Sequence, residues 1–264
     1  MNLGLQGKLA VVSGSTAGIG YAIAAVLSDE GARVVINGRT QARVDTAIIN
    51  LQRRNRGAEF GGVAADLGTT EGIEALLKET PNADILVNNL GIFEVRPFAE
   101  ITDAEWMRFF EVNVMSGVRL SRSYLPGMLK KNWGRIIFIS SESGQQIPAE
   151  MVHYGMTKTA QIAVARGIAE SVAGTGVTVN SVLVGPTASE GVGKYLQDMA
   201  LSQGKNPAEI EKEFFNSGRP SSLLRRFATP EEVASVVAFV ASTSAAVMNG
   251  AAVRAEGGVV RSIL

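Results

Sequence analysis

A tyrosine and a lysine four residues apart are the side chains best suited to chemistry in this sequence. They are Tyr154 and Lys158, in the segment Tyr-Gly-Met-Thr-Lys at the head of a stretch with helical periodicity. Positions i and i+4 share one face of a helix, so the ammonium is expected close to the phenol. A nearby cation stabilises the phenolate and lowers the pKa of the phenol, which makes it a usable proton donor and acceptor. An ordinary surface pair is the alternative, because this spacing is common.

Ser141 is a second candidate, because it directly follows the apolar run RIIFIS and precedes the tyrosine in the chain. A hydroxyl at the carboxyl end of a strand can donate a hydrogen bond to a carbonyl oxygen. Together the three side chains predict proton transfer to and from a carbonyl oxygen.

The segment GSTAGIG at 14–20 predicts a site for phosphate. It follows the apolar run KLAVVS, and its glycines Gly14, Gly18 and Gly20 are spaced by four and two residues rather than as G-x-G-x-x-G. Such a turn directs backbone N–H groups and the positive end of a helix at one point, which suits a pyrophosphate. A tight strand-to-helix turn without a ligand is the alternative.

Arg39 favours NADP(H) over NAD(H), although NAD(H) stays open. In dinucleotide sites a carboxylate about 20 residues past the glycines binds the ribose 2′-hydroxyl of NAD. Here the second predicted strand ends Ile-Asn-Gly-Arg-Thr, with Arg39 in the place of the acid. Its guanidinium can bind a 2′-phosphate with two hydrogen bonds. An exposed loop arginine is the alternative.

The composition excludes several classes of protein. Lysine plus arginine and aspartate plus glutamate each number 25, so no basic surface for nucleic acid is expected. The chain has no cysteine and one histidine, which excludes disulfides and thiolate catalysis and argues against a metal site. No apolar run approaches the roughly 20 residues that cross a membrane. We therefore expect a soluble, cytoplasmic protein without metal, nucleic acid or membrane partners.

Alternation of strands and helices predicts the fold. Apolar, β-branched runs without polar alternation indicate strands buried on both faces of a parallel sheet, and helical periodicity separates them. The expected class is α/β: one three-layer domain over 1–264 with a doubly wound parallel sheet, the Rossmann fold. Residues 186–228 do not follow this alternation of strands and helices. They are interpreted as a substrate lid, or alternatively as an insertion that only covers the surface. Strands are predicted at 9–13, 33–37, 84–89, 135–140, 177–184 and 251–255, and helices at 19–28, 41–54, 106–131, 156–173 and 231–241.

Taken together, these motifs resemble the short-chain dehydrogenase/reductase family, in its single-domain NAD(P)-dependent subclass. The resemblance rests on the glycine turn, Asn88-Asn89-Leu90-Gly91, Asn113, Ser141, Tyr154 with Lys158, and Gly185-Pro186-Thr187, and extends from about residue 7 to the terminal GGVVRSI. Three features depart from the usual pattern of the family: Ser13 stands in place of a threonine, Leu90 stands in place of an alanine, and Leu-Val precedes Gly185.

The resemblance implies a role for each matched residue. Tyr154 would be the general acid in reduction and the base in oxidation, Lys158 would lower its pKa and bind the nicotinamide ribose, and Ser141 would orient the carbonyl. Asn113 would hold a water that links Lys158 to solvent, Asp66 and Leu67 would border the adenine, and Thr187 would reach the carboxamide. The predicted catalytic set is Asn113, Ser141, Tyr154 and Lys158, and the predicted cofactor set is Gly14, Ser15, Thr16, Gly18, Ile19, Gly20, Arg39, Asp66, Leu67, Asn89, Gly91, Tyr154, Lys158, Gly185, Pro186 and Thr187.

Substrate residues are less determined by the sequence. Phe93, Glu142, Gln146 and Met151 are predicted to border the pocket, and Glu142 is expected either to select a hydroxyl or amine or to be a solvated loop acid. His153 directly precedes Tyr154, but adjacent helix residues point about 100° apart.

The predicted activity is NADP(H)-dependent interconversion of a carbonyl and a secondary alcohol of a small molecule. A 3-oxoacyl-thioester (acyl carrier protein) reductase is an alternative, and a non-catalytic NADP-binding sensor is an alternative of another class. The resemblance also implies a homo-oligomer, commonly a tetramer.

Overall fold

Parallel strands form one sheet in the order β3-β2-β1-β4-β5-β6-β7. This computed structural model describes residues 2–263, apart from the side chains of Lys194 and Tyr195. Strands β4, β5 and β6 are buried along their whole length, as their near-continuous apolar sequences predict. The strands are β1 (Leu9–Val12), β2 (Arg33–Gly38), β3 (Phe60–Ala64), β4 (Ile85–Asn88), β5 (Gly134–Ser141), β6 (Val177–Val184) and β7 (Ala252–Ala255).

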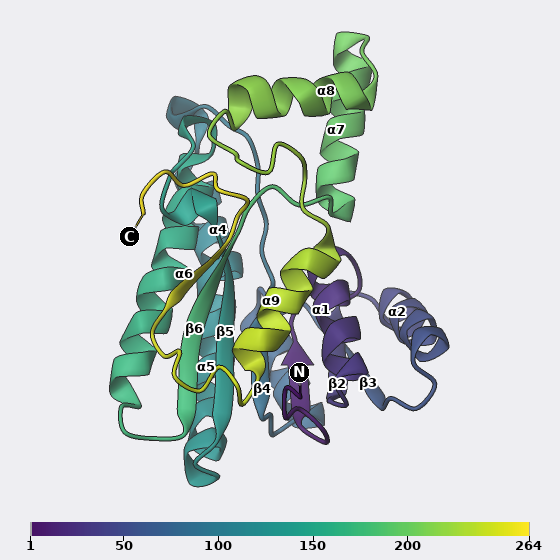
Figure 1. The fold of residues 1–264 in the computed structure, drawn as a ribbon, viewed down its shortest axis with the longest axis vertical. Helices are drawn as coiled ribbons and strands as arrows, with labels where there is room; N and C mark the ends of the chain where they lie inside the picture. The colour runs from purple at the N-terminus through teal and green to yellow at the C-terminus, as the bar shows by residue number, and fades with distance from the viewer. Residues whose placement is uncertain (1, 264) are drawn as a thin grey trace.

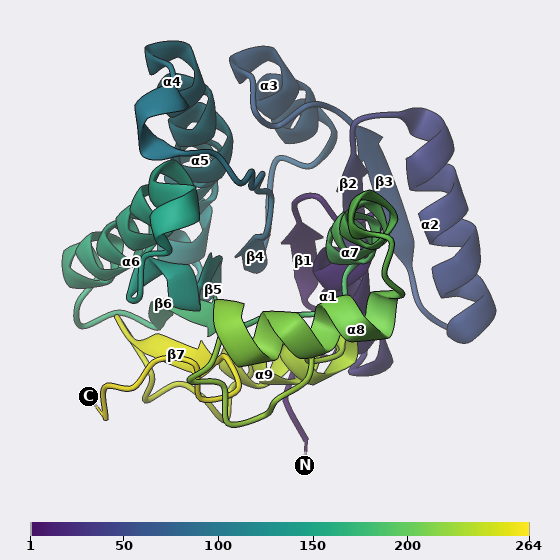
Figure 2. The ribbon, with the colours of Figure 1, turned by 90° about the horizontal axis from the view of Figure 1, so that it is seen from above.

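Helices cover both faces of the sheet (Figure 2). One apolar core joins α1, α2 and α9 to one face, and a second joins α3, α5 and α6 to the other. Alternate residues of one strand point to different cores: Val12 packs in the first and Val11 in the second. The helices are α1 (Gly18–Asp29), α2 (Gln41–Arg54), α3 (Thr70–Glu79), α4 (Asp103–Phe110), α5 (Ser116–Lys130), α6 (Val152–Ser171), α7 (Glu190–Gln203), α8 (Pro207–Glu213) and α9 (Pro230–Ala241).

The predicted doubly wound sheet is confirmed, but the prediction omitted β3 and α3 and merged α4 and α5 into one helix. Strand β3, Phe-Gly-Gly-Val-Ala, was not predicted, because its two glycines mask the β-branched pattern and the strand lies at the edge of the sheet. The single helix predicted over 106–131 is divided by a π-helical turn at Glu111–Met115 between α4 and α5. Such turns interrupt helices frequently at functional sites, and this one contains Asn113.

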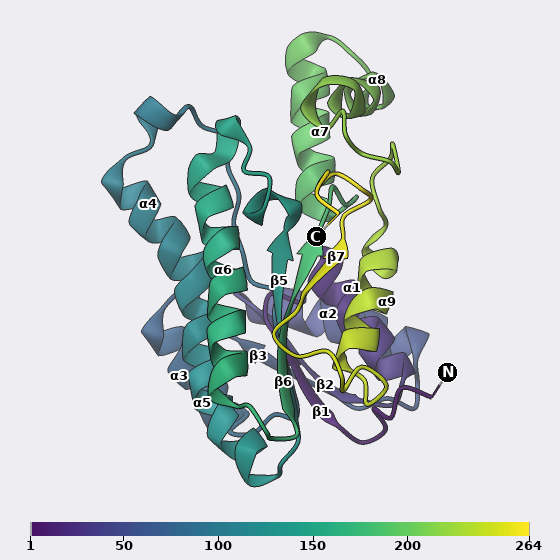
Figure 3. The same ribbon diagram turned by 60° about the vertical axis from the view of Figure 1, so that its left-hand side comes forward.

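Segment 186–228 extends beyond the carboxyl ends of the strands. Helices α7 and α8 project past the end of the sheet, above α1 and α9 (Figures 1, 2 and 3). Glu190, the first residue of α7, forms a 2.8 Å ion pair with Arg43, which holds the start of α7 close to α2. Over the described part of the chain, no helix has the length and hydropathy to span a bilayer.

Candidate active site

The glycine turn between β1 and α1 has the shape of an anion site. Gly14 and Gly18 have φ of +59° and +56°, a backbone region that glycine adopts without strain. Helix α1 begins without a side-chain cap from Ala17, which leaves its first N–H groups available to a phosphate. A Cβ on Gly20 would lie 2.5 Å from both the Gly14 carbonyl oxygen and Asn89 Nδ2, so the turn packs too closely for any larger residue.

Asn37 and Ser13 hold this turn in place. The side-chain oxygen of Asn37 accepts the Gly14 N–H at 3.1 Å, and its amide donates to the Val63 and Ala65 carbonyls. The Ser13 hydroxyl accepts the N–H groups of Asn89 and Leu90, both at 2.9 Å. The sequence did not identify Asn37 as a site residue, and its only signal was a buried amide at the end of an apolar strand.

Arg39 follows β2 and is exposed, with no hydrogen bond or ion pair to any described residue. Asp66 lies exposed after β3, where its carboxylate accepts the Gly68 N–H at 3.0 Å. The Leu67 side chain is buried in the second core, so only its backbone is available to a ligand. The Ser15 hydroxyl is also occupied within the protein, because it donates to the Val12 carbonyl and accepts the Asn37 N–H. These positions can therefore contribute backbone, apart from Arg39 and Asp66, whose side chains are accessible.

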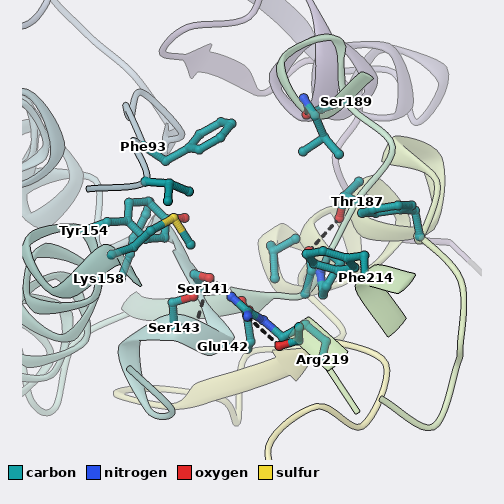
Figure 4. A pocket seen from close by; sticks show the side chains of 18 of the residues that line it. Phe93, Ser141, Glu142, Ser143, Tyr154, Lys158, Thr187, Ser189, Phe214 and Arg219 are labelled. Atoms are coloured by element: carbon teal, nitrogen blue, oxygen red, sulfur yellow. Dashed lines mark hydrogen bonds and ion pairs between the residues drawn. The ribbon is translucent and has the colours of Figure 1, made fainter. Parts of the chain in front are cut away.

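A cavity of about 530 Å³ opens at the carboxyl edge of the sheet, beneath α7 and α8 (Figure 4). It joins Ser141, Tyr154 and Lys158 of the predicted catalytic set to part of the predicted cofactor set, whereas Asn113 is fully buried and is not among its lining residues. An added Cβ on Gly91 would lie 3.4 Å from Lys158 Nζ, so glycine keeps this wall open. The predicted residues that line the cavity are Ile19, Asn89, Gly91, Phe93, Ser141, Glu142, Met151, Tyr154, Lys158, Gly185, Pro186 and Thr187.

Gln146, which was predicted as a substrate residue, is not among the residues that line this cavity. The chain turns after the short helix Glu142–Gly144, and the Gln146 N–H donates to the Glu142 carbonyl at 2.8 Å. This turn leaves the Gln146 side chain exposed. His153 also points elsewhere: it is buried against Phe109, with ring centroids 4.0 Å apart, and burial lowers its pKa.

Lys158 is fixed by two hydrogen bonds in the protein. Its ammonium donates to the Ile139 carbonyl at 2.8 Å and to Gln161 Oε1 at 3.1 Å. Gln161 in turn donates to the backbone carbonyl of Asn113 at 2.6 Å. The side chain of Asn113 is itself held by Ile92, whose N–H and carbonyl it binds at 2.8 and 3.0 Å. Gln161, which was not predicted, therefore connects Lys158 to Asn113; its place one turn after Lys158 in α6 was the available signal.

The environment raises the pKa of Tyr154 above its usual value. Burial is the largest cause and the negative charge of Glu142 adds to it, whereas a hydrogen bond with Ser141 and the charge of Arg219 oppose it. Burial also lowers the pKa of Lys158 to about 8, and Glu142 opposes that change. The expectation that Tyr154 has a lowered pKa is therefore wrong for the protein by itself, because desolvation and the charge of Glu142 outweigh the Ser141 hydrogen bond and the charge of Arg219. At neutral pH Tyr154 is a phenol, ready to donate a proton.

Ser141 belongs to a polar chain that the sequence did not predict. Its hydroxyl donates to Glu142 Oε2 and accepts the Ser143 N–H at 3.1 Å. The other carboxylate oxygen of Glu142 accepts Arg219 Nε at 3.1 Å, in a pair whose side chains are 6% and 10% exposed. Arg219 comes from the segment after α8, 77 residues away, and no pattern in the sequence pairs it with Glu142. Figure 4 shows Ser141, Glu142 and Arg219 together at one end of the cavity.

Comparison with known proteins places this geometry among oxidoreductases. The model of the short chain dehydrogenase family matches residues 8–200. An uncharacterized oxidoreductase of Bacillus subtilis, YvaG, is 48% identical, and the alignment covers 100% of both chains. A 3-oxoacyl-[acyl-carrier-protein] reductase of Vibrio cholerae is 34% identical over 97% of this chain and 98% of its own. The crystal structure of L-sorbose reductase from Gluconobacter frateurii, complexed with NADPH and L-sorbose, matches with a TM-score of 0.94 at 30% identity, and 100% of each chain is covered.

Proposed function

Because this chain belongs to the short-chain dehydrogenase/reductase family, we propose that it interconverts a carbonyl compound and a secondary alcohol with NADP(H). One observation carries the proposal: Ser141, Tyr154 and Lys158 line a single cavity that continues to Gly91 and Asn89 beside the glycine turn. A carbonyl in this cavity can meet a proton donor on one side and the nicotinamide site on the other. The bound nicotinamide supplies or accepts the hydride.

Tyr154 donates the proton in the reductive direction. Its raised pKa keeps the phenol protonated at neutral pH, so the proton is available when negative charge develops on the carbonyl oxygen. The ammonium of Lys158 lies 5.6 Å from the centre of the tyrosine ring and stabilises the phenolate that remains. Ser141 orients the carbonyl oxygen by hydrogen bonding. In oxidation the same phenolate takes the proton from the alcohol.

The cofactor preference follows from Arg39. Its guanidinium lies at the end of β2 and pairs with no residue that the structure describes. Together with the absence of an acid over 36–40, it favours a 2′-phosphate over a free 2′-hydroxyl. The NADPH complex of the reductase from Gluconobacter frateurii supports this choice. Segment 186–228 serves as the lid, since Val192, Met199 and Phe214 close the cavity from above. A homo-oligomer in the cytoplasm stays the expected state of the protein.

Replacement of Tyr154 by phenylalanine tests the proposal. The change removes one hydroxyl and should lower kcat at least about 10²-fold for any ketone that the wild type reduces. The rate is followed by oxidation of NADPH in steady state. Tyr124→Phe is the matched control, because that hydroxyl donates to the Thr80 carbonyl at 2.8 Å and does not line the cavity. The control should lose stability and keep its kcat; near-normal kcat in Tyr154→Phe would contradict the assigned role.

A further inference from the structure

The buried ion pair between Glu142 and Arg219, beside Ser141, is not needed for the proposed proton transfer. Two carboxylates, from Glu142 and Glu150, contact the single guanidinium of Arg219, at 3.1 and 3.3 Å. Removing such charges from water costs free energy, and an apolar group of the same size would often be more stable. Glu142 lines the same cavity as Tyr154 and Ser141. The Glu142 side chain is therefore in a position to contact a ligand in the cavity.

Glu142 has acceptor capacity to spare. Among the described residues its Oε1 accepts Arg219 Nε and its Oε2 accepts the Ser141 hydroxyl, whereas a carboxylate offers about four lone-pair positions. The group that it receives from a ligand must be a hydrogen-bond donor. Because Arg219 already pairs with Glu142, an added ammonium would lie close to the guanidinium, and an added carboxylate would lie close to the Glu142 carboxylate. A neutral hydroxyl satisfies the carboxylate and adds no charge.

The distance between the Ser141 hydroxyl and the Glu142 carboxylate indicates how far the hydroxyl of the substrate lies from its carbonyl. The Ser141 oxygen and Glu142 Oε2 are within hydrogen-bond distance of each other. A carbonyl oxygen bound to Ser141 and a hydroxyl bound to Glu142 can then lie roughly 3 Å apart, the spacing of oxygens on adjacent carbons. From this juxtaposition we propose that the substrate is an α-hydroxyketone and that Glu142 selects it by accepting its hydroxyl. This inference rests on the carbonyl–alcohol activity proposed above.

Binding of that hydroxyl also changes the partner of Ser141. Without a substrate the Ser141 proton points to Glu142. When the substrate hydroxyl donates to Glu142, the serine proton is free to turn to the adjacent carbonyl oxygen. The carbonyl carbon would receive a hydride from bound NADPH and its oxygen the proton of Tyr154, so the products would be a vicinal diol and NADP⁺. Phe93 and Val192 line the same cavity and can accommodate an apolar substituent on the other side of the carbonyl.

Three ketones that share a phenyl group test the inference with NADPH as reductant. They are 2-hydroxyacetophenone, propiophenone, in which a methyl replaces the hydroxyl, and benzoylformate, in which a carboxylate replaces the hydroxymethyl group. The wild type should favour the hydroxyketone over propiophenone at least about 10²-fold in kcat/KM, since a site built to bind a hydroxyl rejects an analogue that lacks it.

Glu142→Gln keeps the shape of the side chain and removes its charge. In this variant the ratio of kcat/KM for the hydroxyketone to kcat/KM for propiophenone should fall at least about tenfold. The fall should come from a lower kcat/KM for the hydroxyketone, with little change in kcat/KM for propiophenone. A purely structural defect would reduce both values equally. Glu150→Gln is the matched control, because it removes the other carboxylate on Arg219 and leaves Ser141 untouched; it should keep the wild-type ratio. Thermal unfolding of each variant verifies the fold, and Glu142→Asp provides a second variant if the amide destabilises the protein.

The outcomes separate the two proposals. Loss of the ratio in Glu142→Gln alone supports the inference. Equal preference of the wild type for propiophenone or benzoylformate, or an unchanged ratio in Glu142→Gln, overturns the inference and leaves the carbonyl reductase function in place. Absence of NADPH oxidation with all three ketones counts against both.

Discussion

Replacement of Lys158 by methionine should remove a strong pH dependence from the stability of the protein. Burial lowers the pKa of Lys158 from 10.5 to about 8, so the folded protein holds this proton less tightly than the unfolded chain does. The difference corresponds to about 3 kcal/mol of destabilisation at pH 7. This penalty is complete below pH 8 and disappears as the pH rises to the usual pKa of lysine. The contribution of Lys158 to the free energy of unfolding should therefore rise by about 2 kcal/mol between pH 7 and 9.5.

Urea unfolding, followed by tryptophan fluorescence at several pH values from 7 to 9.5, measures this contribution. The relevant quantity is the difference between wild type and Lys158→Met, because the remaining titrating groups are common to both. Loss of the bonds to Ile139 and Gln161 shifts that difference by a constant amount, whereas removal of the charge changes its slope. At pH 7 the variant is relieved of the burial penalty, and at pH 9.5 the wild type has regained about 2 kcal/mol relative to it.

Lys130→Met is the matched control, because it removes an exposed lysine from α5. This variant should follow the wild type across the whole pH range. A difference between wild type and Lys158→Met that stays constant from pH 7 to 9.5 would refute the reasoning, since it would mean that the Lys158 ammonium is not desolvated in the folded protein.

Two further changes test the cofactor site and the N-terminal cap of α9. Arg39→Ala should raise KM for NADPH at least about tenfold, the equivalent of one charge-assisted hydrogen bond, and leave KM for NADH unchanged; the exposed Arg53→Ala on α2 is its control, and equal effects on both cofactors would exclude a 2′-phosphate contact. Thr229→Ala removes the cap of α9, where the threonine oxygen accepts the Glu232 N–H at 3.2 Å, and should cost about 1 kcal/mol in urea unfolding. Ser235→Ala in the same helix should be neutral or stabilising, and an equal loss there would show that the cap is not the cause.

Local signals in the sequence predicted much of this protein. Apolar runs located six of the strands, because parallel strands buried on both faces need continuous hydrophobicity. Helices α4, α8 and α9 each begin with a capping box, a feature that depends only on residues within one helical turn. The side chains Ser141, Tyr154 and Lys158 could be named for the same reason: strand ends and helix spacing determine where they point.

Long-range contacts decided the rest of the site. Nothing near Glu142 in the chain indicates that its carboxylate is buried, because its partner Arg219 arrives from the segment after α8. The raised pKa of Tyr154 is likewise a tertiary property, since desolvation depends on every element that encloses the cavity. The sequence by itself determined which groups can move a proton and a hydride. Only the folded chain determined how those groups are solvated and paired, because burial and charge pairing join residues that are far apart in the sequence.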